Sequence, residues 1–156
     1  MKDMDVQNKY LFFLSGGDMY AIKALIVSEI IEYSNITKVP QMSPFVKGVT
    51  NIRGNIVPVI DLLERVGLGT TRINDRTSII VVNHSEDDEE MQIGIIIDEV
   101  YEVDNIFPEN IKKAPEFGPK IDTRFILEMG KYRDEYVEIL DTQSLLKLDE
   151  LSKIYE

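Results

Sequence analysis

Short apolar segments rich in Ile, Val, Phe and Tyr recur along the chain, and each is bounded by Gly, Asn, Asp or Pro. Segments of this length and composition are typical of β-strands. They predict strands at residues 10–15, 19–24, 29–33, 56–60, 78–82, 91–97 and 136–140. The fold is therefore expected to be mainly β.

Helical spacing is clear only near the C-terminus. After Asp141 or Thr142, either of which can serve as an N-cap, five apolar residues fall roughly on one helical face: Leu145, Leu146, Leu148, Leu151 and Ile154. Short helical turns are also expected at 43–48 and 61–67. Small helices should thus sit at the corners of the β-structure, with residues 147–156 forming a C-terminal helical extension.

Two pairs of segments resemble each other across the halves of the chain. Residues 19–36 resemble 91–106, residues 52–66 resemble 128–146, and one further strand precedes each set. This repeat predicts two similar five-stranded barrels within one domain, at about 10–70 and 75–146. Because so small a barrel has little interior of its own, the two should share a hydrophobic core, with a groove between them. Chance similarity remains the alternative, and strand exchange between the barrels would leave the pattern unchanged.

The charge balance narrows the range of partners. Seventeen basic against 28 acidic residues give a formal net charge of −11, which repels nucleic acid and anionic membranes. No apolar run is long enough to span a bilayer, the N-terminus lacks the pattern of a signal peptide, and there is no cysteine. We expect a cytoplasmic protein that neither binds nucleic acid nor inserts directly into a membrane.

Residues able to support catalysis or metal binding are few. His84, the single histidine, opens the acidic stretch 84–90, which is predicted to be a solvated hairpin loop without a second nitrogen ligand. Asp61 and Asp141 occupy equivalent places in the repeat, and capping of a helical turn accounts for both. Carboxylate chemistry stays formally open, but no enzyme, metal or cofactor is expected. Contact with other proteins is the favoured interpretation.

The hairpin at "NIRGN" (51–55) is the clearest candidate for such a contact. Gly54 permits the turn, and Arg53 either solvates it or presents its donors to a partner. The surrounding "FVKGVTNIRGNIVPVIDL" resembles the signature of CheW-type chemotaxis coupling proteins. Further matches run in order from about Tyr10 to Leu146: "YAIKALIVSEII", "ITKVP", "DRTSIIVV", "IGIIIDEVYEV" and "PEFGPKIDTRFILEMGK".

This resemblance implies two SH3-like β-barrels around a shared core. It also implies a non-enzymatic adaptor that couples the cytoplasmic tips of chemoreceptors to the regulatory domain of the histidine kinase CheA, at membrane-associated receptor arrays. Carried over by position, the kinase or receptor contacts fall on Asn51, Arg53 and Gly54. The receptor groove between the barrels falls on Leu11, Val27, Ile30, Val100 and Tyr101.

Two alternatives accompany this hypothesis. A coupling protein of the related CheV type would carry a receiver domain, for which the remaining length has no room. A small carboxylate enzyme or ligand carrier would instead use the groove between the barrels, and it would need paired acids with shifted pKa values there.

Overall fold

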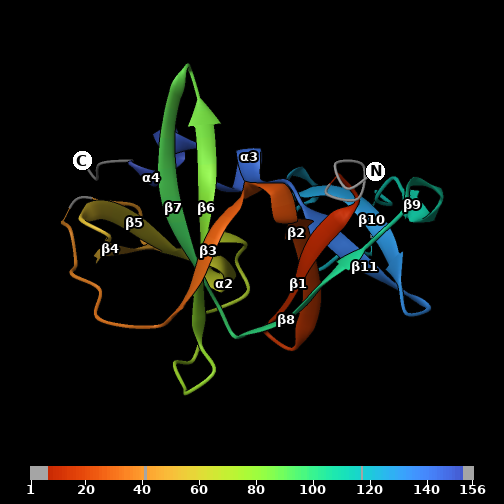
Figure 1. The fold of residues 1–156 in the computed structure, drawn as a ribbon, viewed down its shortest axis with the longest axis horizontal. Coiled ribbons are helices and arrows are strands. Elements are labelled where there is room, and N and C mark those ends of the chain that lie inside the picture. The colour runs from red at the N-terminus through yellow and green to blue at the C-terminus, as the bar shows by residue number, and fades with distance from the viewer. Residues whose placement is uncertain (1–6, 41, 117, 153–156) are drawn as a thin grey trace.

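The computed structural model describes residues 7–40, 42–116 and 118–152. They form two sheets that lie side by side (Figure 1). The first sheet has the strand order β3-β6-β7-β5-β4 and the second has β8-β1-β2-β11-β10-β9. The strands of the first sheet are β3 (Val27–Glu32), β4 (Val46–Ile52), β5 (Asn55–Asp61), β6 (Ser78–Glu86) and β7 (Glu89–Ile97). Those of the second are β1 (Lys9–Ser15), β2 (Asp18–Lys23), β8 (Glu99–Asn105), β9 (Ile111–Lys112), β10 (Ile126–Tyr132) and β11 (Glu135–Leu140).

The two sheets share one topology. Strands β3, β6, β7, β5 and β4 correspond in order to β8, β1, β2, β11 and β10. Each sheet contains one parallel pair, β5 with β7 and β11 with β2, and all its other pairs are antiparallel. This common order confirms the repeat seen in the sequence.

The repeat is assembled by exchange of hairpins. The β1–β2 hairpin joins the sheet made by the second half of the chain, and β6–β7 joins the sheet made by the first. The predicted ranges 10–70 and 75–146 therefore do not coincide with the sheets, which contain residues 27–97 in one case and 9–23 with 99–140 in the other. The sequence could not show this, because equivalent hairpins offer equivalent edges for pairing.

Each sheet curls so that its two edges meet. Beyond β3, Thr37 forms an isolated bridge with Val49 on the opposite edge strand, through N–H···O bonds of 2.9 and 2.8 Å. Beyond β8, the short strand β9 pairs with β10 in the same way. These closures agree with the expected SH3-like barrels.

A shared hydrophobic core joins the sheets. Successive residues of β1 point to opposite faces, so Leu11 and Phe13 enter the shared core while Phe12 enters a separate core inside the second sheet. In β6, Ile80 enters the shared core and Ile79 a core inside the first sheet. The exchanged hairpins are therefore buried on both faces, and the predicted common core is confirmed.

Short helices lie between the strands and after β11. They are η1 (Ala24–Ile26), α2 (Leu62–Arg65), η2 (Pro108–Asn110), η3 (Thr123–Phe125), α3 (Thr142–Leu145) and α4 (Leu148–Leu151). The predicted C-terminal helix is thus two short helices interrupted at Leu146 and Lys147, and Ile154 lies outside the described residues.

One buried side chain ties the two sheets together at these helices. Arg65, at the end of α2, donates to the carbonyl oxygens of Leu145 at 2.6 Å and Ser144 at 2.9 Å, and to Glu150 Oε1 at 2.5 Å. Its guanidinium also lies over the rings of Phe45 and Phe125, one from each half of the chain. Arg65 therefore fixes α2 of the first sheet against α3 and α4, which follow the second.

Two sequence predictions about polar residues are wrong. His84 is 2% exposed within β6 and contacts Glu86 Oε1 at 3.0 Å, because the strands extend until only Asp87 and Asp88 form the turn. Asp61 precedes α2 but does not cap it. Its carboxylate accepts instead from the N–H and hydroxyl of Thr71, in the loop beyond α2, and burial raises its pKa.

The other predicted cap is confirmed. The carboxylate of Asp141 accepts from the backbone N–H groups of Gln143 and Ser144 at the start of α3. Equivalent aspartates thus serve different purposes in the two halves of the repeat.

Candidate partner-binding surface

The tip of the β4–β5 hairpin is a two-residue turn made by Arg53 and Gly54, with φ of 52° and 86°. Two consecutive left-handed residues give the tight turn that matches the twist of paired strands, and Gly54 adopts this conformation without strain. Asn51 Oδ1 accepts from the N–H of Gly54 at 3.0 Å. Asn51 and Gly54 therefore shape the tip, and Arg53 is the residue that it presents.

The side chain of Arg53 is 81% exposed and reaches across to β3, where its Nε lies 3.0 Å from Glu29 Oε2. An ion pair this exposed contributes little to stability. Beside it, Ile56 is 66% exposed at an outward position of β5. Sequence reasoning missed Ile56, although its alternation with the inward Val57 marks it as an apolar residue facing water. An arginine next to an exposed apolar side chain is a combination often found at protein interfaces.

A second surface lies where the edge strands β3 and β8 meet the shared core. On β3, Val27 and Ile30 pair with Val82 and Ile80, both members of that core, so all four side chains point to one face. A β-bulge after Val27 puts residues three apart on the same side. Ile30 is 42% exposed.

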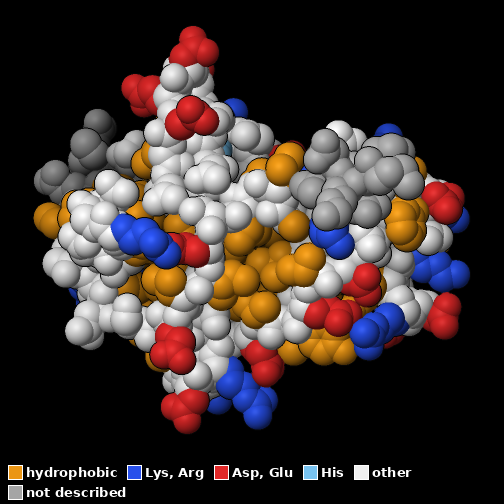
Figure 2. Space-filling view, viewed as in Figure 1, with side chains coloured by type: hydrophobic (Ala, Val, Ile, Leu, Met, Phe, Trp, Pro, Cys, Tyr) orange, Lys and Arg blue, Asp and Glu red, His pale blue; other side chains and the backbone are white. Residues whose placement is uncertain are grey.

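Strand β8 repeats this arrangement. Val100 pairs with Phe13 and Val103 with Leu11, again with a bulge between them and with both partners in the shared core. Val103 is 52% exposed, more than Ile30. We call the set Val27, Ile30, Val100 and Val103 the edge-strand surface. Figure 2 shows hydrophobic side chains gathered between the two sheets on this face, with acidic and basic side chains on the projections around them.

Three of the five residues predicted for a receptor groove belong to this surface: Val27, Ile30 and Val100. Leu11 is wrong as a contact residue, because it is 1% exposed and lies in the shared core, as the cross-strand neighbour of Val103. Tyr101 is exposed, but it occupies the bulge and its hydroxyl accepts from Arg133 at 3.2 Å. Sequence reasoning missed Val103, because strict alternation along the strand would have placed it on the face opposite Val100.

Arg133 belongs to a hairpin that mirrors the first one. Arg133 and Asp134 form the β10–β11 turn with φ of 50° and 65°, and Arg133 pairs at 2.9 Å with Glu102 on β8. Arg53 pairs with Glu29 on the corresponding strand β3. The aligned segments of the repeat contain both arginines, so the sequence carried this signal.

Within the described ranges, no helix combines the length and hydrophobicity needed to cross a membrane.

The model of the CheW-like domain matches residues 9–150. The chain is 32% identical over 149 residues to the chemotaxis protein CheW of Klebsiella aerogenes, covering 96% of this chain and 87% of that protein. It is 33% identical over 139 residues to CheW of Bacillus subtilis, covering 88% and 86%. The crystal structure of the scaffolding protein TtCheW from Thermoanaerobacter tengcongensis superposes with a TM-score of 0.81 at 30% identity, covering 92% of this chain and 90% of that one. Sequence, topology and structural similarity agree, and the chain belongs to the CheW family of chemotaxis scaffold proteins.

Proposed function

We propose that this protein is a non-enzymatic adaptor that couples the cytoplasmic tips of chemoreceptors to the regulatory domain of the histidine kinase CheA. Membership of the CheW family supports the chemotaxis role. The observation that carries the adaptor role is the presence of two distinct partner-type surfaces, a charged hairpin tip and an apolar edge-strand surface. Such a protein would be cytoplasmic and recruited to membrane-associated receptor arrays through its partners.

The kinase contact is assigned to the hairpin formed by Asn51, Arg53 and Gly54, with Ile56 beside it. Its turn geometry is fixed by the Asn51–Gly54 hydrogen bond, so binding costs little ordering of the backbone. Arg53 already pairs with a carboxylate, Glu29, and can exchange it for a carboxylate or carbonyl of the partner.

The receptor contact is assigned to the edge-strand surface. A receptor tip is a helical hairpin, and its apolar side would cover Ile30 and Val103 by helix-in-groove recognition. Each large apolar side chain buried in this way contributes about 1.5–3 kcal/mol before the costs of ordering. Val27 and Val100, which are half-buried against the shared core, would form the floor of the contact.

Calorimetric titration with the isolated regulatory domain of the cognate kinase tests the first contact. We expect saturable one-to-one binding that Arg53→Glu weakens by about tenfold or more, because a partner carboxylate would then face a like charge. Arg76→Glu is the matched control, since Arg76 is similarly exposed at 75% and lies away from the hairpin. Absence of binding by the folded protein would refute the kinase assignment.

A pair of aspartate substitutions separates the two surfaces. Val103→Asp should weaken binding to a soluble receptor-tip fragment and leave kinase binding intact, whereas Ile56→Asp should do the reverse. Both side chains are about half or more exposed, so neither substitution buries a charge in the native fold. Equal loss of both activities in either variant would contradict the division into two surfaces.

The alternative hypothesis of a small carboxylate enzyme would need buried acids with shifted pKa values. Asp61 is a buried acid with a raised pKa, but it does not support this hypothesis. Both of its oxygens are occupied by hydrogen bonds from Thr71. Its raised pKa has burial as the main cause and needs no catalytic role.

A further inference from the structure

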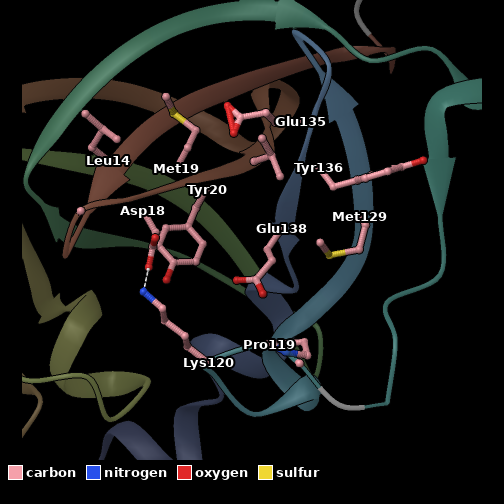
Figure 3. Close-up of a pocket in the computed structure, with 13 residues that line it drawn as sticks. Leu14, Asp18, Met19, Tyr20, Pro119, Lys120, Met129, Glu135, Tyr136 and Glu138 are labelled. Carbon is pink, nitrogen blue, oxygen red and sulfur yellow. Dashed lines mark hydrogen bonds and ion pairs between the residues drawn. The ribbon is translucent and has the colours of Figure 1, made fainter.

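A pocket of about 420 Å³ opens on the second sheet, bounded by β2, β10, β11 and the loop 118–120 (Figure 3). Its apolar walls come from Leu14, Met19, Met129 and Tyr136, and its polar lining from Asp18, Lys120, Glu135 and Glu138. None of these residues belongs to the hairpin tip or the edge-strand surface. The size falls at the lower end of the range for small-ligand sites.

Glu138 stands at the centre of this lining. In the sheet it lies between Met129 on β10 and Tyr20 on β2, and Figure 3 shows its carboxylate among these side chains. Among the described residues, none donates a hydrogen bond to the Glu138 carboxylate. Burial, and then the nearby Asp18, raise the pKa of Glu138, because both disfavour its ionised form. A positive charge placed beside the carboxylate would offset this effect and stabilise the ionised form.

The pocket contains one cation of its own. Lys120 Nζ lies 2.9 Å from Asp18 Oδ2, and this hydrogen bond raises the pKa of Lys120. Lys120 also lowers the pKa of Glu138, but less than burial and Asp18 raise it, so the carboxylates of Asp18, Glu135 and Glu138 share one cation in the pocket lining. The pKa of Tyr20 rises to about 12 because of its burial and of the charges of Glu138 and Asp18, which agrees with a negative potential in the pocket.

We propose that this pocket binds an aliphatic chain ending in an ammonium or guanidinium group, with the cationic end against Glu138. Methionine thioethers adapt to an aliphatic stem, and the face of a tyrosine ring attracts a cation. Met129, the cross-strand partner of Glu138, supplies the first contact, and Tyr136, on the same face of β11, supplies a ring that already has Lys112 Nζ 5.9 Å from its centroid. Such a group occurs in a free small molecule and equally at the end of a lysine or arginine side chain of a partner protein.

The first arm of the test uses agmatine, which carries both cationic groups on a four-carbon chain, with uncharged pentanol as the reference compound. Methyl NMR of the full-length protein should show saturable shifts of Met19 and Met129 with agmatine and none with pentanol. Glu138→Gln should weaken agmatine binding by about tenfold or more. Glu109→Gln removes the same charge at an exposed site on η2 and should have no effect.

Lys120→Met distinguishes the proposal from general damage to the pocket. Removing the internal cation leaves Asp18 unneutralised, so agmatine should bind several times more tightly, whereas a distorted pocket would bind it less well. If Lys120→Met weakens binding while Glu138→Gln does not, the proposal is wrong.

The second arm addresses a cation supplied by a partner. If agmatine does not bind, but Glu138→Gln weakens binding of the kinase domain or the receptor fragment while Glu109→Gln does not, the cationic group belongs to that partner. If neither arm responds to Glu138→Gln in a protein with native circular dichroism, the proposal is overturned. This result would leave the proposed adaptor function intact, because that function rests on Arg53 and the edge-strand surface.

Discussion

Replacement of Arg65 by alanine tests whether this side chain holds the two sheets together. The guanidinium donates to two main-chain carbonyls and to Glu150, and its side chain is 4% exposed. Alanine would leave the carbonyls of Leu145 and Ser144 without these donors and would open space between Phe45 and Phe125.

The magnitude follows from those contacts. Hydrogen bonds to charged groups contribute about 1.5–3 kcal/mol each, and Arg65 makes two of them to carbonyl oxygens. The bond to Glu150 adds less, because Glu150 is partly exposed and keeps its pairing with Arg124. We expect a loss of about 3–5 kcal/mol in the free energy of unfolding, the range for breaking a buried ion pair. For a domain of this size this corresponds to a Tm lower by roughly 6–20 °C.

Urea unfolding followed by circular dichroism measures this loss, since the chain has no tryptophan for fluorescence. The control is Arg76→Ala, which removes an exposed arginine whose partner Glu99 lies at 3.6 Å and should cost less than about 0.5 kcal/mol. A loss for Arg65→Ala of less than about 1 kcal/mol, close to that of the control, would show that Arg65 does not link the sheets.

Three further substitutions have defined outcomes. Gly48→Ala should destabilise the protein by several kcal/mol in urea unfolding, or prevent folding. The reason is that a Cβ at this position would lie 2.1 Å from the Thr37 carbonyl oxygen, at a φ of 147°. Near-native stability would refute the close contact between Gly48 and Thr37 at the closure of the first barrel. Hydrogen bonds from Arg124 and then Arg65 lower the pKa of Glu150 from its ordinary 4.5 to about 2, so its stabilisation should be complete above about pH 4.5 and disappear as the pH falls toward 2. Glu150→Gln should flatten this part of the stability curve, and an unchanged acid profile would contradict the assignment. Asn51→Ala removes the acceptor for the Gly54 N–H and should lower the free energy of unfolding, measured in urea, by about 0.5–1.5 kcal/mol. An unchanged free energy of unfolding would contradict a stabilising role for this hydrogen bond.

The sequence was sufficient for seven of the eleven strands in the described residues, for the repeat and for the hairpin at Arg53, because each depends on local composition or on similarity between segments. It was insufficient for the pairing of β1–β2 with β11 and of β6–β7 with β5, which depends on which of two equivalent edges a hairpin meets. The same limit applies to any duplicated β-protein whose hairpins are interchangeable.

The candidate surface shows a second limit. Alternation along a strand assigns residues to faces only where the pairing register is regular, and a bulge shifts every residue beyond it. The bulge in β8 turns Val103 toward the face of Val100 and leaves Tyr101 beside Arg133. Burial set a third limit, since nothing in the local sequence distinguishes Leu11, which is inaccessible, from an apolar residue at the surface.

The exchanged hairpins also affect how the two proposed partner surfaces are held relative to each other. Strands β1 and β6 each contribute alternate residues to the shared core and to the core of one sheet, so neither sheet can open without disrupting the common interior. The edge-strand surface takes Val27 and Ile30 from one sheet and Val100 and Val103 from the other, and its shape depends on this shared core. The Arg53 hairpin is the β4–β5 turn of the first sheet, and its tip lies beside Glu29, the residue next to Ile30. Under the proposed function, a partner bound at either surface would therefore be held at a fixed position relative to the other, as coupling through a rigid adaptor requires.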